Sequence, residues 1–177
     1  IDVSIVNVAL QAIDDSLHFS DANLQWILSA YTLTFGGLLL LGGRLGDLYG
    51  RRRLFLTGLV VFIVGSTLCG FAQSELMLIL SRALQGVGAA IISPVALSIL
   101  TTIFPEGAER NKALGIWGAL AGIGGAVGVL AGGLLVELLS WHWIFLINVP
   151  ICLAVLVLAP RFIYESVGEG SHHLHAL

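Results

Sequence analysis

Two charged residues stand inside long apolar runs of this sequence and are its clearest candidates for chemistry. Arg82 lies about six residues into a run that begins near Leu76, and Asp2 lies within the apolar run that opens the chain. A charged side chain removed from water needs an opposite charge or strong hydrogen bonds. A carboxylate balanced between apolar surroundings and an arginine can take up and release a proton, and Asp2 is the candidate partner of Arg82.

The composition places these residues in a membrane. Hydrophobic residues make up 57% of the chain and charged residues only 11%, and the mean hydropathy is +0.97. A soluble domain of this size would carry many more charges. Several apolar runs of about 20 residues are each long enough to cross a hydrocarbon core roughly 30 Å thick. We therefore predict an all-α integral membrane protein.

The two charged residues are expected to lie deep in the membrane, where a charge is costly. At about 1.5 Å per helical residue, Arg82 would lie on the order of 10 Å below one surface and Asp2 about 18 Å below it. An arginine at such a depth costs at least about 2.5–3.5 kcal/mol, so we expect it to face the bundle interior or a wet cavity. Each residue also has a simpler interpretation that stays open. The Arg82 side chain could extend to the outer interface, and Asp2 could be a solvated chain end.

The apolar runs predict six membrane spans in one bundle. The first run, residues 1–13, is too short to cross and fits a helix whose beginning has been cut away. The other five are expected at about residues 24–43, 54–72, 76–104, 113–136 and 144–162. Pro94 should bend the fourth span, because proline lacks the amide hydrogen that a helix interior uses.

The chain is expected to divide into two parts. Residues 1–165 form the six-span bundle, and residues 166–177 form a polar tail that a non-native sequence would also explain. The tail contains His172, His173 and His175. An exposed tail is preferred over a metal site as their explanation, so no metal site is predicted. Cys69 and Cys152 lie in apolar runs without metal-ligand spacing and are interpreted as core residues.

Charge placement predicts the topology. Seven basic residues fall at span ends or loops on one side of the six-span arrangement: Arg44, Arg51, Arg52, Arg53, Arg110, Lys112 and Arg161. The loops on the other side contain five acids and no lysine or arginine. The acids are Asp14, Asp15, Asp21, Glu75 and Glu137. By the positive-inside rule the arginine side is cytoplasmic, which places the N-terminus in the cytoplasm and the chain in a cell membrane as a multi-pass protein.

A polar stretch between the second and third spans has the highest concentration of charged residues in the sequence. It reads Gly43-Arg44-Leu45-Gly46-Asp47-Leu48-Tyr49-Gly50-Arg51-Arg52-Arg53, and it resembles the loop between the second and third helices of the major facilitator superfamily of transporters. The resemblance implies a cytoplasmic gating motif made of Gly43, Asp47, Gly50, Arg51 and Arg52. Charge alone permits a simpler role, in which the arginines bind lipid phosphates and set the orientation.

The same resemblance implies partners for two residues of this motif. Asp47 would accept hydrogen bonds from a helix N-terminus in the other half of the transporter, where the helix dipole favours a carboxylate. Arg51 would pair with an acid near the inner end of the fourth helix, and Glu106 and Glu109 are the candidates.

Two further segments resemble the family. Residues 80–90 resemble its fourth-helix motif Arg-x-x-Gln-Gly-x-Gly-Ala-Ala, here Arg82, Gln85, Gly86 and Gly88, in which the arginine is associated with proton transfer. The two glycines would let a neighbouring helix approach closely. Residues 1–10 resemble the first-helix signature of the fourteen-span drug:proton antiporters. Gln11 stands where that signature has proline.

Glycine recurs throughout the fifth span at spacings that favour close helix packing, as in the pairs 118/122, 124/128 and 128/132. Such faces occur in membrane helices of every function. Gly124, Gly128, Gly132 and Gly133 also resemble the hinge motif Gly-x-x-x-Gly-Pro-x-x-Gly-Gly of antiporters. Val129 replaces its proline, which is thought to favour a kink that limits leak in exchangers, and this departure weakens the antiport interpretation.

The segment Trp141–Pro150 resembles the start of the family's sixth helix, with His142 in place of an arginine. His142 is interpreted as an interfacial residue in preference to a proton relay.

The resemblance covers residues 1–165 and implies the N-terminal six-helix bundle of a transporter, built as two three-helix repeats. The implied function is proton-coupled efflux of lipophilic drugs by alternating access, in which this fragment alone would be inactive. The implied partners are the lipid bilayer, a small lipophilic substrate and the C-terminal half of the same transporter. The proton gradient would supply the energy, and no cofactor and no nucleic acid are expected.

Other interpretations remain open. An uptake symporter or facilitator is the nearest, supported by Val129. A structural membrane subunit is a further interpretation, and the intramembrane Arg82 argues against it. An enzyme is disfavoured because Ser81 and Ser93 have no histidine at comparable depth and no His-Glu-x-x-His motif is present. The sequence has no Gly-Lys-Ser/Thr loop for a nucleotide, so ATP is not expected to supply the energy.

Overall fold

The computed structural model describes the backbone of residues 2–163, and the side chains of that range except those of Asp2 and Asp21. All regular elements in this range are helices, which confirms the predicted fold class. The predicted boundary at residue 165 and the tail histidines lie outside the described residues. The helices are α1 (Asp2–Leu17), α2 (Asp21–Leu24), α3 (Trp26–Tyr49), α4 (Arg51–Gly70), α5 (Glu75–Ile103), α6 (Ala108–Leu138), α7 (Trp143–Leu146) and α8 (Asn148–Phe162).

Five helical segments are long and apolar enough to cross a membrane. Two of them combine neighbouring helices, since α2 leads into α3 through Gln25 and α7 leads into α8 through Ile147, both in helical conformation. The five segments cover residues 22–49, 51–70, 75–103, 108–138 and 143–162. They correspond to the five complete spans predicted, while α1 has 16 residues.

The predicted loops on both sides are more helical than expected. Asp14 and Asp15, interpreted as loop residues, lie in the last turns of α1, which ends where His18 adopts a φ of 53°. The polar stretch 43–53 is expected to be a loop between spans, but α3 continues to Tyr49 and α4 begins at Arg51. Only Gly50 interrupts the two helices, with a φ of 99° that favours glycine.

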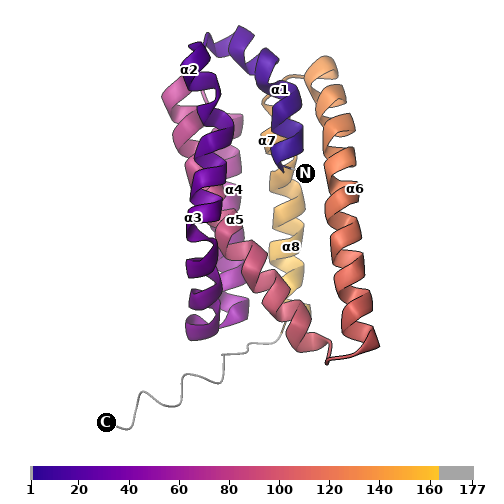
Figure 1. The fold of residues 1–177 in the computed structure, drawn as a ribbon. Coiled ribbons are helices and arrows are strands. Elements are labelled where there is room, and N and C mark those ends of the chain that lie inside the picture. The colour runs from indigo at the N-terminus through magenta and orange to yellow at the C-terminus, as the bar shows by residue number, and fades with distance from the viewer. Residues whose placement is uncertain (1, 164–177) are drawn as a thin grey trace, which may run out of the picture.

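The helices form two groups connected by α5. In Figure 1, α3, α4 and the first half of α5 form one group, and α1 and α6 form the other, with α7 and α8 between them. Helix α8 packs on α4. The second half of α5 slants toward the beginning of α6 (Figure 1). The most extensive contacts join α5 to α3 and α4, and α1 packs mainly on α6. One core cluster near the end opposite the arginines joins residues of both groups, such as Ile5, Ile27 and Phe145. A second cluster joins α4, α5 and α8 through Phe55, Val95 and Ala159.

Pro94 lies within α5 without ending it. Because proline has no amide hydrogen, the carbonyl of Ala90 loses its usual donor four residues later. Gly42 of α3 lies directly against this carbonyl, and a Cβ at position 42 would overlap the carbonyl oxygen. The missing side chain at Gly42 thus allows α3 to approach α5 next to the proline, where a Cα–H group can contact the freed oxygen.

Candidate functional site

Arg82 is entirely buried in the bundle interior, with 0% of its surface exposed. Its Nε donates a hydrogen bond of 3.0 Å to the carbonyl oxygen of Ile27 in α3. Its guanidinium carbon lies 4.3 Å from the centre of the Tyr31 ring, a cation–π arrangement. Arg82 therefore faces inward as predicted, and the alternative in which it extends to the interface is wrong.

Gln85 connects Arg82 to the neighbouring helix α4. Arg82 Nη1 donates a 2.6 Å hydrogen bond to Gln85 Oε1, and Gln85 Nε2 donates a 2.7 Å hydrogen bond to the hydroxyl of Ser66. Both Gln85 and Ser66 are fully buried. The side chains form a chain of hydrogen bonds that begins at α3, passes through α5 and ends at α4. Such a network stabilises a buried charge because its hydrogen bonds replace those that water would make.

The glycines beside Gln85 bring three helices together. A Cβ at Gly86 would lie 2.6 Å from the carbonyl oxygen of Tyr31 in α3, and a Cβ at Gly88 would lie 2.6 Å from the amide nitrogen of Phe62 in α4. On α4, a Cβ at Gly65 would lie 2.7 Å from the amide nitrogen of Gln85. This is the close approach that the sequence predicted for Gly86 and Gly88.

Three members of the network around Arg82 were not found from the sequence: Ile27 and Tyr31, which contact Arg82, and Ser66, which contacts Gln85. Ile27 contributes its backbone carbonyl, and because every residue has one, the residue type gives no indication of this contact. Ser66 had one usable signal, a hydroxyl next to Gly65 within an apolar run. A polar side chain and a glycine at adjacent positions of a span are typical of a helix contact with a hydrogen bond.

Asp2 is the first residue of α1, and its side chain lies outside what the structure describes. Figure 1 shows that α1 begins well below the end of the bundle at which it meets α2. The buried face of α1, with Ile5 and Val6, belongs to the same core as Phe145. The ring of Phe145 has its centre 5.8 Å from the Arg82 guanidinium. Helix α1 therefore packs in the core around Arg82, while the Asp2–Arg82 pair itself stays a prediction.

The stretch that resembles the family's gating motif forms a small cluster across the junction of α3 and α4. Arg51 Nη2 lies 3.4 Å from Asp47 Oδ1, and Arg51 Nη1 donates to the hydroxyl of Thr102 near the end of α5. Gly50, between the acid and the arginine, is buried. Gly43 faces Pro94 at an ordinary contact distance, since a Cβ there would lie 3.5 Å from Pro94 Cβ. The cluster joins three helices at the arginine end of the bundle.

The predicted acidic partner of Arg51 is wrong. Among the described contacts Arg51 meets neither Glu106 nor Glu109, and Glu106 instead lies 3.2 Å from Arg110. The physical reason is the turn before α6. It brings Glu106 next to Arg110, which follows four residues later, so that Arg110 and not Arg51 is its partner. The hydroxyl of Thr102 occupies the position expected for the acid.

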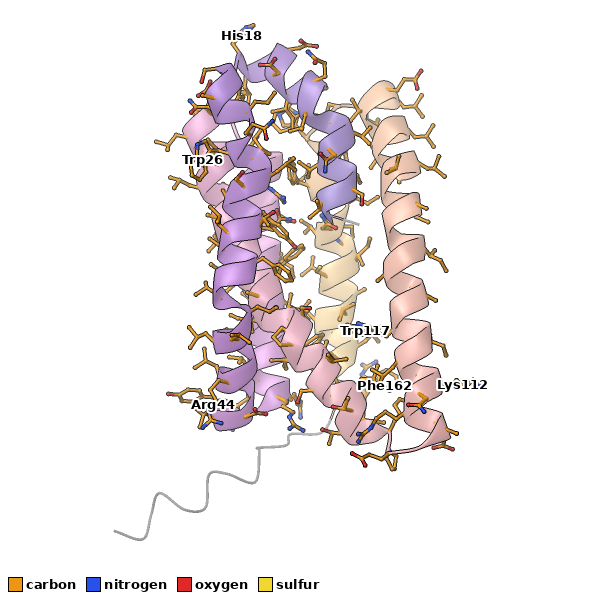
Figure 2. The ribbon with its side chains drawn as sticks, viewed as in Figure 1. His18, Trp26, Arg44, Lys112, Trp117 and Phe162 are labelled. Carbon is orange, nitrogen blue, oxygen red and sulfur yellow. The ribbon has the colours of Figure 1, made fainter. Side chains whose placement is uncertain are left out.

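The charge distribution along the bundle follows the predicted topology. In Figure 2, Arg44 and Lys112 lie at one end, together with Phe162, and His18 lies at the other end. Trp26 lies near the His18 end in the same view and is 47% exposed. An exposed indole near the end of a span is typical of a membrane interface.

The fifth-span glycines divide into a packed and an open part. Gly124, Gly128 and Gly132 are buried in α6, and a Cβ at Gly132 would lie 2.7 Å from Ile5 Cγ1 of α1. A Cβ at Gly133 would lie 4.0 Å from Val8 Cγ1. The predicted packing face thus contacts α1 at Gly132. The pair 118/122 has no atom within 4 Å of an added Cβ in the described chain, so its predicted packing is not found there.

A cavity of about 620 Å³ lies between α5 and α6. Its lining carries no charged side chain and consists of Ile92, Ser93, Ala96, Trp117, Leu120, Ala121 and Gly124. The contacts of α1 with α6 begin near Gly125, one residue after this lining ends.

His142 lies between α6 and α7 and its ring stacks on Trp141, with ring centres 3.7 Å apart. Partial burial lowers the pKa of His142 below its ordinary value, because desolvation disfavours the charged imidazolium. The stacked, partly buried ring fits the predicted interfacial position.

Comparison with known proteins places this architecture in a family. A sequence model of the Major Facilitator Superfamily matches residues 1–175. The puromycin resistance protein pur8 of Streptomyces alboniger is 49% identical over 164 residues, which cover 91% of this chain and 33% of that protein. The cephamycin export protein CmcT of Amycolatopsis lactamdurans is 51% identical over 160 residues, which cover 90% of this chain and 33% of that protein.

A third relative, the multidrug resistance protein Stp of Mycobacterium tuberculosis, is 41% identical over 169 residues, covering 96% of this chain and 32% of its own length. The chain thus spans about a third of the length of these curated relatives. A crystal structure of the peptide transporter POT in complex with sulfate matches the fold with a TM-score of 0.64 and 19% identity, covering 90% of this chain and 35% of that one. From the match over residues 1–175 and these relatives, the chain belongs to the Major Facilitator Superfamily of membrane transporters.

Proposed function

We propose that this chain is the N-terminal bundle of a proton-coupled exporter of small lipophilic molecules that works by alternating access. The observation that carries the proposal is the fully buried Arg82 with its hydrogen bonds to Gln85 and Ile27. A charge held in the interior of a membrane bundle is costly, and such residues mark proton or substrate pathways. The names of the relatives as resistance and export proteins support the direction of transport.

In this proposal, Asp2 takes up and releases the coupling proton, and Arg82 sets the balance of charge beside it. When Asp2 is protonated, the positive charge of Arg82 rests on Gln85 Oε1, the Ile27 carbonyl and the Tyr31 ring. When Asp2 is ionised, the two charges attract each other. A shift in this balance changes how firmly α1 is held against α5, which links proton binding to helix movement.

The conformational change involves a second bundle, the C-terminal half of the same transporter, with the substrate between the two. The cluster of Asp47, Arg51 and Thr102 lies at the arginine end, where it is suited to close the cytoplasmic side. The energy comes from the proton gradient without a cofactor. The protein lies in a cell membrane with a cytoplasmic N-terminus, because the arginine end should face the cytoplasm.

A second candidate is an uptake symporter or facilitator of another small solute. The observation that favours it is Val129, which stands where the antiporter motif has proline. Helix α6 continues without a break through this position, so the kink that proline would favour has no local cause there.

The two candidates differ in the direction of coupling. Inverted membrane vesicles that contain the full-length transporter and an inside-acid proton gradient should accumulate a fluorescent lipophilic cation if the protein is an antiporter. A symporter or facilitator would not show accumulation driven by this gradient.

A further inference from the structure

We propose that Arg110 is a positioning residue that fastens the inner end of α5 to the first turn of α6, so that these two helices move together. The consequence for transport rests on the proposed function, whereas the fastening rests on hydrogen bonds of the described chain. Arg110 Nε donates to the carbonyl oxygen of Phe104 at 2.9 Å, and Nη2 donates to the carbonyl oxygen of Thr101 at 2.9 Å.

These two carbonyls belong to the end of α5, whose last helical residue is Ile103. The last carbonyls of a helix have no partner within the helix, and they carry a partial negative charge. A guanidinium is planar and presents its donors in a fixed fork, so one side chain can bind two such oxygens at once. Arg110 therefore reaches the two acceptors from two different nitrogens, an arrangement that the single nitrogen of a lysine cannot reproduce.

The local sequence builds this arrangement. Pro105 follows the end of α5, where it cannot continue the helix. Gly107 has a φ of 136°, which favours glycine and turns the chain back toward α5. Helix α6 begins at the next residue, so that Arg110 falls in its first turn.

The third contact of Arg110 contributes less. Nη1 lies 3.2 Å from Glu106 Oε1, but the Glu106 side chain is 90% exposed. An ion pair open to water is weakened by solvent and salt. The two backbone acceptors, and not the acid, should therefore determine the position of Arg110.

The neighbouring residue of α5 is held by a second arginine. Thr102 binds Arg51 from the first turn of α4, while Thr101 binds Arg110 from the first turn of α6. The Arg51 contact is made to a side-chain hydroxyl, and the Arg110 contacts are made to the main chain. We expect the connection through Arg110 to persist when the cluster around Arg51 opens, so that α5 carries α6 with it.

The test uses the full-length transporter in lipid nanodiscs and measures amide hydrogen exchange in residues 101–112. Arg110→Lys keeps the positive charge but loses the fork, and it should speed exchange at the amides of Phe104 and Asn111 at least about fivefold. Lys112→Gln is the matched control. It removes a positive charge from the same turn, where Lys112 is exposed and makes no hydrogen bond or ion pair within the described residues. Its exchange should equal that of the wild type, as should that of Glu106→Gln.

Transport of a fluorescent lipophilic cation by the same variants gives a second readout. The Arg110→Lys variant should have a lower maximal rate and an unchanged KM, because helix movement and not substrate binding is impaired. Exchange that stays unchanged in Arg110→Lys, or that rises equally in Lys112→Gln, would overturn the fastening. Faster exchange with an unaltered maximal rate would overturn the proposal that α5 and α6 move together during transport. If the wild type itself does not transport, the proposed function fails, and the exchange result still decides on Arg110.

Discussion

Arg82 and Gln85 are joined by a hydrogen bond of 2.6 Å between Nη1 and Oε1, and neither side chain is exposed. The two residues are three positions apart on α5, so they share one face of the helix. Gln85 uses its carbonyl oxygen for the arginine and its amide for Ser66. The amide group thereby connects a buried charge to a second helix.

Replacement of Gln85 by leucine should destabilise the bundle by about 1–3 kcal/mol, because it leaves polar groups of Arg82 and Ser66 buried with fewer partners. Ser66→Ala should cost less, about 1 kcal/mol, since it removes only one hydrogen bond of the network. Thermal unfolding of the full-length transporter in detergent measures both. An equal or larger loss in Ser66→Ala would contradict the assigned order.

Gly86→Ala should lower the unfolding temperature by several degrees, because the new Cβ would lie 2.6 Å from the Tyr31 carbonyl oxygen and such overpacking costs about 1–3 kcal/mol. Gly118→Ala is the control, since Gly118 has nothing within 4 Å in the described chain. Wild-type stability in Gly86→Ala would show that α3 and α5 are not as close as described.

Gly50→Ala should destabilise the junction of α3 and α4 by about 1–2 kcal/mol, because a φ of 99° is unfavourable for a residue with a side chain. Gly43→Ala, whose Cβ would meet Pro94 only at 3.5 Å, should be tolerated better. The comparison of their unfolding temperatures tests whether Gly50 is required for its backbone conformation. Similar losses in both variants would show that it is not.

His142 should make stability depend on pH. Burial lowers its pKa in the folded protein, so the unfolded chain, with an ordinary histidine pKa of about 6.5, binds a proton more readily. Stability is therefore fully present above about pH 6.5 and decreases as the pH falls through this value toward the lower pKa of the folded state.

Removal of the imidazole isolates this contribution. Between pH 7.5 and 5.5, the unfolding temperature of His142→Gln should fall less than that of the wild type, although other groups titrate in both proteins. An identical pH dependence in the two proteins would mean that His142 is not perturbed by burial.

The sequence predicted much of this arrangement because its signals are local. Apolar run length gave the spans, and the cost of a buried charge indicated that Arg82 faces inward. Glycine at a close contact also has a local signature, as at Gly86 and Gly88. These features depend on one residue type and its own surroundings.

Other parts of the site could not be predicted, because they depend on where distant segments meet. Ile27 binds Arg82 across 55 residues of sequence and Ser66 binds Gln85 across 19. Thr102 replaced the expected acid beside Arg51, because the turn at Gly107 sets Glu106 against Arg110 instead. The extension of α3 to Tyr49 was missed because charged residues at the end of a span resemble a loop by composition.

The central claim is that Asp2 and Arg82 couple proton movement to export. The most direct measurement compares dye accumulation by wild type, Asp2→Asn and Arg82→Lys in inverted vesicles with an inside-acid gradient, after expression and insertion are matched. The account predicts gradient-dependent accumulation in the wild type and its loss in both variants, while Lys112→Gln transports normally. Accumulation that ignores the gradient and survives both substitutions would contradict the account and leave Arg82 with a structural role.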